Sequence, residues 1–344
     1  MRVEELTKDN KSWQSFLKSH KHFVFHTPQF KQFIEETFKN TKTVYLAAID
    51  EGEIKTIFPF FFIKHILFGK KIISSAFIEY GGPAGDMTYV CDIIDYLKDN
   101  HYGNADYVEV RHGFDEAEDT LRDCFIKDTK FKKFILKLNK SSDVVWNNVD
   151  KMRKKAVKKA DKSGIEVKKL NEENIDELYN LYLKNMKAFG SPPYPKSFFT
   201  GFFAHKLGKC FGSFHEDKLV AALLGYTCGE RIHVVISVSD QKYLNYRPND
   251  AVHWEFIKFG CENKFKLFDF GRVREESGQF DFKRRWGAEL SDLPSYYHVL
   301  KGKKELPDVD IDNFKFKLLM SIWKKMPLFI TKWIGPWIRE GLGI

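Results

Sequence analysis

The spacing of apolar residues predicts helices and strands in alternation through the first part of the chain. Apolar residues recur at helical spacing over 28–38, behind a Thr27-Pro28 start signal. Two mostly apolar stretches meet at Glu51-Gly52-Glu53 and predict a hairpin. We then expect a strand from 71, a helix near 88–100, a strand near 105–113 and a strand near 132–138 that closes a first α/β lobe.

The second part repeats this order of elements. A helix is predicted over 141–163, because its apolar residues fall on one face and Gly164 supplies a stop signal. We further expect a strand at 165–169, helices at 172–188 and 196–206, three strands within 209–239, a helix at 250–263 and a strand at 265–271. The repetition indicates an α/β fold with two related lobes, 1–140 and 141–305, and a tail at 306–344.

The tail has the pattern of a basic amphipathic helix. One helical stripe, with lysines between its members, comprises Phe314, Leu318, Ile322 and Met326, and bulk is added by Trp323, Trp333 and Trp337. This combination suits an anionic lipid headgroup interface, so residues 311–344 are candidates for peripheral membrane contact. A helix that packs on the second lobe is the alternative.

Charge and cysteine content narrow the class of protein. The 344 residues carry a formal net charge of +9, which favours an anionic partner such as a nucleotide, a nucleic acid or an anionic membrane. The five cysteines are scattered without a C-x-x-C pair, which disfavours a zinc site or a disulfide framework. Neither a signal peptide nor a bilayer-spanning run of roughly 20 apolar residues is evident. We therefore expect a cytoplasmic protein, with peripheral contact at the inner face of the plasma membrane through its tail.

The order of strands and helices in the second lobe points to a particular fold more specifically than the charge or the cysteine content does. A meander, a strand ending at Ser239, a loop, the helix 250–263 and a strand ending at Gly271 follow the central pattern of GNAT-type acyltransferases. In that fold a strand splays from its neighbour, the acyl donor enters the gap, and a helix N-terminus faces the donor phosphates. Coenzyme A-binding members usually carry a glycine-rich loop before this helix, whereas 241–250, QKYLNYRPND, has no glycine. The loop therefore weakens acyl-CoA as the donor; a plain strand–helix–strand unit is the alternative reading of the pattern.

Several segments together point to a family. They are FHTPQF (25–30), EYGGPAGD (79–86), MRKKAVKKADKSGIEV (152–167), YLNYRPNDAVHWEFIKFGCENKFKLFDFGR (243–272) and FDFKRRWGAE (280–289). In their order and spacing the chain resembles the Fem-type aminoacyltransferases, which are two tandem GNAT-like lobes. The similarity is greatest to the FemAB-like branch found beside exopolysaccharide and exosortase (PEP-CTERM) loci. The resemblance implies transfer of an acyl or aminoacyl group to an amine.

The resemblance also assigns residues of the second lobe. The family's Phe-Lys pair falls on Phe282 and Lys283, where the backbone N–H of the Phe helps bind the carbonyl oxyanion and the Lys stabilises charge. A fixed N–H group and a cation of this kind would stabilise the negative charge that develops on the carbonyl oxygen during acyl transfer. Arg272, Arg274 and Arg285 join Lys283 as electrostatic contacts to substrate. The alternative is that Lys283 to Arg285 form one solvated helical turn.

Candidates in the first lobe concern the acceptor. The Gly-Pro turn in EYGGPAGD resembles the family's turn near the acceptor groove, so Tyr80 and Asp86 are assigned to substrate binding; an ordinary tight turn is the alternative. Glu109 and Arg111 alternate with valines, and a cleft-facing strand would offer Glu109 to the amine; a solvent-facing edge is the alternative. The lysine-rich face of 151–162, with Arg153, is a candidate phosphate contact or simply a solvated surface.

We therefore interpret the chain as an N-acyltransferase or aminoacyltransferase acting on an amine of a cell-envelope precursor, related to peptidoglycan or exopolysaccharide. Two alternatives stay open: an acyl-CoA-dependent N-acyltransferase for a sugar amine, and a non-catalytic module that binds RNA or membrane. No bound cofactor and no metal is expected, because the acyl donor, aminoacyl-tRNA or acyl-CoA, is a co-substrate. His233 and His253 lie near the expected donor loop but receive no role from sequence.

Overall fold

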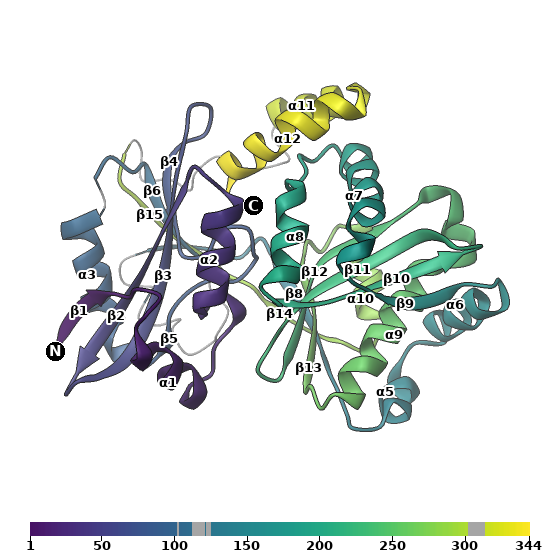
Figure 1. The fold of residues 1–344 in the computed structure, drawn as a ribbon, viewed down its shortest axis with the longest axis horizontal. Coiled ribbons are helices and arrows are strands. Elements are labelled where there is room, and N and C mark those ends of the chain that lie inside the picture. The colour runs from purple at the N-terminus through teal and green to yellow at the C-terminus, as the bar shows by residue number, and fades with distance from the viewer. Residues whose placement is uncertain (102, 112–120, 122–124, 302–313) are drawn as a thin grey trace. The chain divides into compact units, whose positions relative to one another are not determined.

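The computed structural model describes residues 1–101, 103–111, 121, 125–301 and 314–344 (Figure 1). The contacts among the residues divide the chain into two compact units. The first unit comprises 1–130, 293–309 and 337–344, and the second comprises 131–292 and 310–336. Each unit contains its own mixed sheet with helices, as the repeated order of elements predicts. No described helix is both long enough and apolar enough to cross a membrane.

The first unit is built on a sheet with the strand order β1-β2-β3-β4-β6-β15-β7 among the described residues, and β5 pairs with β3. Its strands are β1 Arg2–Glu5, β2 Thr41–Asp50, β3 Glu53–His65, β4 Gly69–Ile73, β5 Ala84–Gly85, β6 Tyr107–Arg111, β7 Ile126–Asp128 and β15 Ser295–Val299. Its helices are α1 Lys11–Ser19, η1 Val24–His26, α2 Pro28–Thr37, η2 Met87–Tyr89 and α3 Val90–His101. Figure 1 shows α3 on one face of this sheet and α1 and α2 on the other.

Local sequence explains the start of α2, and apolar packing holds it in place. The Thr27 side chain accepts a hydrogen bond from the backbone N–H of Phe30, and Pro28 occupies the first helical turn. Phe30 then packs edge-on against Phe61 of β3, with 6.4 Å between the ring centroids. The opposite face of the sheet buries a separate apolar cluster that includes Ile93 and Leu97 of α3.

The second unit has the strand order β14-β8-β13-β12-β11-β10-β9. Its strands are β8 Lys132–Lys137, β9 Glu166–Leu170, β10 Gly208–His215, β11 Lys218–Cys228, β12 Arg231–Ser239, β13 Leu267–Val273 and β14 Glu289–Asp292. Its helices are α5 Ser142–Asn148, α6 Lys151–Lys162, η4 Glu172–Asn174, α7 Ile175–Phe189, α8 Lys196–Ala204, η5 Gln241–Tyr246, α9 Pro248–Glu262, α10 Gly278–Arg284 and α11 Phe314–Lys325. The helix α12 Leu328–Leu342 begins in this unit and ends in the first.

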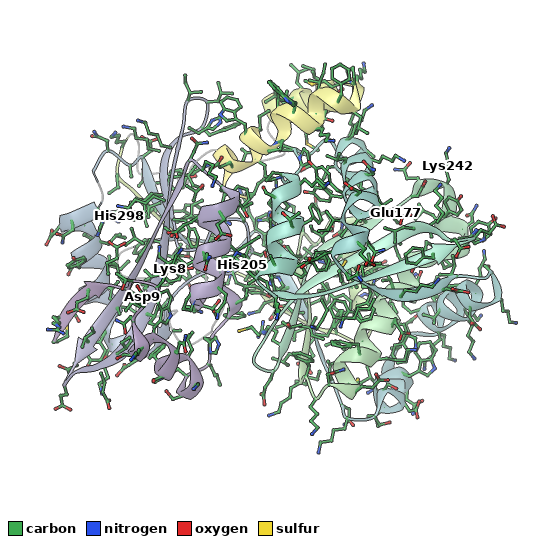
Figure 2. All side chains as sticks on the ribbon, viewed as in Figure 1. Lys8, Asp9, Glu177, His205, Lys242 and His298 are labelled. Atoms are coloured by element: carbon green, nitrogen blue, oxygen red, sulfur yellow. The ribbon has the colours of Figure 1, made fainter. Side chains whose placement is uncertain are left out.

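Helices cover both faces of the second sheet. In Figure 1, α7 and α8 lie on one face, and α5, α6 and α9 lie on the other. The carboxylate of Glu177 on α7, labelled in Figure 2, accepts a hydrogen bond from the backbone N–H of Leu219 at the start of β11. On the α9 face, Phe256 packs with Phe268 and with the fully buried Trp286 in one apolar cluster. This cluster fixes α9 against the strands on either side of the candidate site.

The structure differs from the sequence-based expectation in three elements. The strand at 132–137, expected to close the first lobe, pairs with β13 and β14 in the second sheet. The helix expected over 141–163 is two helices, because Asp150 caps α6 by accepting from the N–H of Met152 at 2.7 Å. The helical tail is likewise two helices, which separate just before Pro327.

Candidate active site

The neighbouring strands β12 and β13 separate along their length. They pair in parallel at only three positions, from Arg231–Leu267 to His233–Asp269, and β12 then continues for six residues beyond the last paired position. Opposite β11, a β-bulge at Val235 interrupts the ladder, since Gly225 pairs with Val234 and Leu224 with Ile236. Bulges bend a strand and re-aim its backbone, so the opening between β12 and β13 is part of the sheet itself. This is the splayed-strand arrangement that the sequence predicts.

The loop after β12 leads directly into α9. Residues 241–246 form the 3₁₀ helix η5, so a short helical turn stands where a glycine-rich loop was looked for. Arg247 then adopts a left-handed conformation, with φ +63°, and Pro248 begins α9. A left-handed conformation is unusual for a residue with a side chain, and it turns the chain sharply into the helix. The N-terminus of a fifteen-residue helix is thereby placed after the splayed strand.

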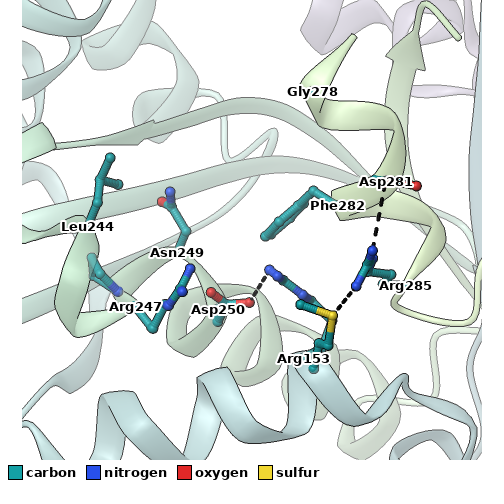
Figure 3. Close-up of a pocket in the computed structure, with 11 residues that line it drawn as sticks. Arg153, Leu244, Arg247, Asn249, Asp250, Gly278, Asp281, Phe282 and Arg285 are labelled. Carbon is teal, nitrogen blue, oxygen red and sulfur yellow. Dashed lines mark hydrogen bonds and ion pairs between the residues drawn. The ribbon is translucent and has the colours of Figure 1, made fainter. Parts of the chain in front are cut away.

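A pocket of about 410 Å³ lies at this helix N-terminus, wholly within the second unit (Figure 3). It is lined by Met152, Arg153, Leu244, Arg247, Pro248, Asn249, Asp250, Gly278, Asp281, Phe282 and Arg285. Three of these side chains are arginines, and the first turn of α9 adds the positive end of the helix dipole. The pocket therefore suits an anionic group such as a phosphate.

Arg153 is held between a carboxylate and an aromatic ring. Its Nη1 donates to the Asp250 carboxylate at 2.5 Å, and its guanidinium lies 4.9 Å from the centre of the Phe282 ring, as Figure 3 shows. Two buried polar atoms of the lining, Nε of Arg153 and Oδ1 of Asn249, have no hydrogen-bond partner among the described residues. Buried polar atoms are almost always hydrogen-bonded, so an unsatisfied donor and acceptor in one pocket indicate a ligand with matching groups.

Arg285 lies on the α10 side of the same pocket. Its guanidinium contacts the Met152 sulfur and is 3.8 Å from the Asp281 carboxylate. Arg284 holds that carboxylate more closely, at 2.9 Å, and the pair with Arg284 is the main cause of the lowered pKa of Asp281. Because Asp281 is shared with Arg284, much of the charge of Arg285 is available to a ligand.

Lys283 does not line the pocket. Its side chain is buried, and its ammonium donates to the carbonyl oxygens of Gly271 at 3.1 Å and Arg272 at 2.8 Å. Gly271 has φ +72°, a conformation that turns the end of β13 and presents these carbonyls. The observed contacts make Lys283 an anchor between α10 and the end of β13. Its predicted role in stabilising transferred charge stays a prediction.

Phe282 contributes its ring to the pocket wall. Its backbone N–H, which was predicted to bind the carbonyl oxyanion, lies within a helix. Phe282 is the fifth residue of α10, a position whose N–H in a regular α-helix donates to the carbonyl four residues earlier. Arg272 and Arg274 do not line the pocket either, since both guanidiniums lie over the Phe131 ring, at 4.8 and 5.3 Å from its centre. Of the residues assigned to the second unit, the structure brings Phe282, Arg285 and Arg153 together.

An aromatic layer beneath the pocket encloses His253. The imidazole lies against the rings of Phe270, Phe282 and Trp286, and its Nδ1 is 2.7 Å from the backbone oxygen of Asn249. Because a carbonyl only accepts, Nδ1 carries the proton in this contact. Burial lowers the pKa of His253 to about 4, so the ring is neutral near pH 7. Its contacts support the pocket wall, and the sequence offered no sign of them.

Glu109 and Arg111 of the first unit are buried against each other. Nε of Arg111 donates to the Glu109 carboxylate at 2.8 Å, and its Nη1 donates to the carbonyl oxygens of Ser75 and Ile78. The solvent-facing alternative for this strand is wrong, because β4 and β15 flank β6 and both side chains are covered. The carboxylate is committed to a structural pair in the observed conformation.

The turn EYGGPAGD likewise has structural contacts. Tyr80 is fully buried and stacks on Phe23, with 5.1 Å between the ring centroids. Asp86 caps η2, and hydrogen bonds from the backbone and side chain of Thr88 lower the pKa of its carboxyl. The turn is fixed from inside by His26, whose Nε2 donates to the carbonyl of Gly82 at 3.1 Å.

Sequence reasoning missed Arg247, Asn249 and Asp250. A usable signal was present, because Arg-Pro-Asn-Asp combines a proline helix start with polar first-turn residues. The left-handed conformation of Arg247, which sets where its side chain points, has no such signal.

Comparisons with known proteins agree with the arrangement of β12, α9 and β13 in the second unit. Residues 147–284 match the family described as Acetyltransferase (GNAT) domain. An 81-residue stretch is 32% identical to Lipid II:glycine glycyltransferase of Staphylococcus haemolyticus (strain JCSC1435), and it covers 22% of this chain and 19% of that protein. The chain thus matches about a fifth of the length of this curated relative.

Solved structures show the same fold over most of the chain. The crystal structure of FemX superposes with a TM-score of 0.70 at 13% identity, covering 87% of this chain and 98% of FemX. A tandem GNAT protein from the clavulanic acid biosynthesis pathway superposes with a TM-score of 0.55 at 8% identity, covering 88% of this chain and 99% of that one. These matches confirm the predicted resemblance to Fem-type proteins, while the exopolysaccharide-associated branch stays a prediction. Residues 147–284 of the second unit therefore match an acetyltransferase (GNAT) domain, and the chain as a whole has a fold like those of FemX and of a tandem GNAT protein.

Proposed function

We propose that this protein transfers an acyl or aminoacyl group from a phosphate-bearing donor to an amine of a cell-envelope precursor. The observation that carries the proposal is the arginine-lined pocket at the N-terminus of α9, directly after the strand that splays from β13. The pocket supplies cations and a helix dipole for the donor phosphates. The gap between the strands supplies an extended path for the reactive arm of the donor.

The chemistry asked of the protein is modest. The amine nitrogen forms a bond to the donor carbonyl carbon, the carbon–oxygen bond of an ester donor breaks, and the ammonium proton passes to solvent or to the leaving alkoxide. Holding two reactants in line supplies much of the rate of such a transfer. No general base is assigned, since the two carboxylates that line the pocket, Asp250 and Asp281, are paired with Arg153 and Arg284.

Aminoacyl-tRNA is the favoured donor over acyl-CoA. The helix η5 and the left-handed Arg247 occupy the place of a glycine-rich loop, so the backbone there cannot wrap a pyrophosphate as closely as glycines would allow. Nucleic-acid phosphates need only the cations and the helix N-terminus, both of which are present. The lysine-rich α6, which carries the pocket residues Met152 and Arg153, extends the positive surface beside it.

The acceptor class follows from the relative named for glycine transfer to lipid II. By that analogy the acceptor is an amine on a peptidoglycan precursor, and an exopolysaccharide-related amine is a finer variant of the same proposal. A lipid-linked acceptor lies at a membrane surface, so peripheral membrane contact through the C-terminal helices belongs to the proposal as well.

The test is a transfer assay with two donors. Purified protein is given envelope-precursor amines with either a charged tRNA pool or acetyl-CoA, and the products are identified by mass spectrometry. We expect product with charged tRNA, and a loss of roughly 10- to 100-fold in kcat/KM for Arg285→Ala and for Arg247→Ala, because each removes a charge-assisted contact to phosphate.

The matched control is Lys266→Ala, which removes a cation of the second unit whose partner is the exposed Glu230. It should leave transfer unchanged. Turnover with acetyl-CoA alone would favour the acyl-CoA alternative. Binding of tRNA without turnover of any donor would favour the non-catalytic alternative and refute the proposal.

A further inference from the structure

A stripe of aromatic side chains on α12 faces solvent. Phe329, Trp333 and Trp337 follow one another at four-residue spacing, and 72%, 86% and 43% of their surfaces are exposed. Four-residue spacing places side chains on one side of a helix. Exposing three large aromatic rings in one stripe is unfavourable in water, so the stripe indicates a surface that binds something apolar.

The helix that carries this stripe is firmly held at its C-terminal end. The Glu340 carboxylate accepts from the backbone N–H of Asn40 at 2.6 Å, and the carbonyl oxygen of Leu342 accepts from the buried ammonium of Lys71 at 3.0 Å. Gly341 lies so close to the His65 ring that a Cβ there would be 2.4 Å from it. The exposed stripe is therefore the outer side of a docked helix, and it is not the product of a frayed end.

A second exposed apolar element adjoins the stripe within the first unit. At the β3–β4 turn, Ile66 is 88% exposed and Leu67 is 65% exposed. The preceding residue, His65, contacts the Trp337 ring with 4.1 Å between centroids. The tip of this hairpin and the C-terminal part of the aromatic stripe are thus neighbours, joined through one imidazole.

Exposed lysines accompany both elements. Lys64 and Lys70 flank the hairpin tip, and Lys324, Lys325 and Lys332 precede or interrupt the stripe. No carboxylate stands between Phe314 and Ile338, a stretch that carries five lysines. Tryptophan and lysine together are typical of the water–lipid boundary, where the ring enters the headgroup region and the cation meets anionic lipid.

We propose that the aromatic stripe of α12 binds an anionic lipid bilayer, and that the β3–β4 tip, which meets the stripe at Trp337 within the first unit, adds to this binding. The exposed lysines that precede and interrupt the stripe favour a bilayer over an apolar protein groove, since anionic headgroups complement their charge. The surface binds in the interfacial plane, where the apolar side of an amphipathic helix enters the headgroup region. It deepens the proposed function, on which it rests, by naming the residues of the membrane contact that would place the chain beside a lipid-linked acceptor.

The test is co-sedimentation of the full chain with vesicles of phosphatidylcholine, with or without one-third phosphatidylglycerol. We expect binding at least about tenfold tighter to the anionic vesicles, falling as salt rises. Phe329→Ser with Trp333→Ser should reduce this binding by roughly tenfold or more, and Ile66→Ser with Leu67→Ser by a smaller factor. Replacing Lys324, Lys325 and Lys332 by Gln should abolish the preference for anionic lipid.

Control variants and a measurement of how deeply the tryptophan rings enter the bilayer accompany this test. Val144→Ser with Leu290→Ser removes two exposed apolar side chains of the second unit, and should leave vesicle binding unchanged. Brominated lipid should quench the tryptophan emission of the wild-type chain more than that of Trp333→Ser. Unchanged circular dichroism would show that each variant folds.

The proposal fails if the wild-type chain does not bind anionic vesicles, or if the Phe329 and Trp333 variant binds as the wild type does. A dimer in solution that dissociates in that variant, without vesicle binding, would show a second copy as the occupant and also overturn it. Transfer to a water-soluble acceptor is measured separately, so loss of the membrane surface and loss of the proposed function are distinguishable.

Discussion

Arg153 of α6 and Asp250 of α9 form an ion pair across the candidate pocket, with 2.5 Å between Nη1 and the carboxylate oxygen. Both side chains are largely buried. Burial raises the pKa of Asp250, and the guanidiniums of Arg153 and Arg247 oppose that rise. The pair therefore ties two helices together at the site and sets the charge that a ligand meets there.

Removing the carboxylate should leave a buried cation without its partner. We expect Asp250→Ala to lower the free energy of unfolding by about 3 kcal/mol, measured by urea denaturation. The matched control is Glu255→Ala on the same helix, because its pair with Lys258 is partly exposed and should be worth less than about 1 kcal/mol. Equal losses in the two variants would show that the buried pair has no special role.

Lys283 joins α10 to the end of β13 through two carbonyl oxygens. Lys283→Ala should therefore lower stability by roughly 1.5–3 kcal/mol, since hydrogen bonds to a charged group are lost, and transfer should fall as well. A thermal melt of the variant measures the first effect and the transfer assay the second. If transfer falls strongly while the melting temperature holds, the predicted catalytic role of Lys283 would be supported over the anchoring role. If neither changes, both roles are wrong.

Two buried histidines make the fold sensitive to acid. Burial lowers the pKa of His26 to about 3 and that of His253 to about 4, against roughly 6.5 in an unfolded chain. Below pH 6.5 the unfolded chain takes up protons that the folded chain refuses, so this stability is present above pH 6.5 and is lost as pH falls toward 4. Each histidine contributes a slope of up to about 1.4 kcal/mol per pH unit in that window.

Denaturant unfolding at several pH values between 4.5 and 7.5 measures the slope. It should become shallower in His26→Gln and in His253→Gln, because each removes one titrating group. Ser15→Ala, at an exposed position without an ionisable side chain, serves as the control and should keep the wild-type slope. A stability that does not change with pH over this range would contradict the prediction.

Gly81 permits a close backbone approach, though to another strand instead of a ligand. A Cβ at this position would lie 2.7 Å from the carbonyl oxygen of Arg111 and 2.0 Å from the Ser74 hydroxyl. Gly81→Ala should therefore destabilise the first unit by about 1–3 kcal/mol. Gly278→Ala is a suitable control for stability, since nothing lies within 4 Å of its added methyl group. Similar melting temperatures for the two variants would refute the steric argument.

Local patterns predicted much of the fold. The start of α2 followed from Thr27 and Pro28, which cap and open the helix through contacts within three residues. The succession β12, α9, β13 followed from alternating and helical periodicity, and the structure confirms the splayed strands that this order implies. Such features depend on neighbours in sequence, so the sequence alone carries them.

The site was harder to predict because its side chains respond to distant segments. Glu109 is covered partly by β15, which arrives from residues 295–299. Lys283 turns toward carbonyls that the conformation of Gly271 presents. Arg153 was chosen as part of a lysine-rich face, whereas its position in the pocket depends on Asp250, 97 residues away. Periodicity can place a residue on a face but does not reveal the partner that reorients it.

The separation of β12 from β13 has a consequence for selectivity. Beyond His233, the main-chain amides of residues 234–239 that face β13 have no strand partner in the described parts of the chain. A buried main-chain N–H or C=O group without a hydrogen bond raises the free energy of the protein. This edge therefore favours binding of an extended ligand whose own amide groups can hydrogen-bond to it. Binding at this edge depends on main-chain hydrogen-bonding groups, so most side-chain substitutions leave it unchanged. Substitution of the arginines near α9 could therefore change which phosphate-bearing group of the donor is bound. The same strand edge would still bind the extended part of the donor that carries the acyl group.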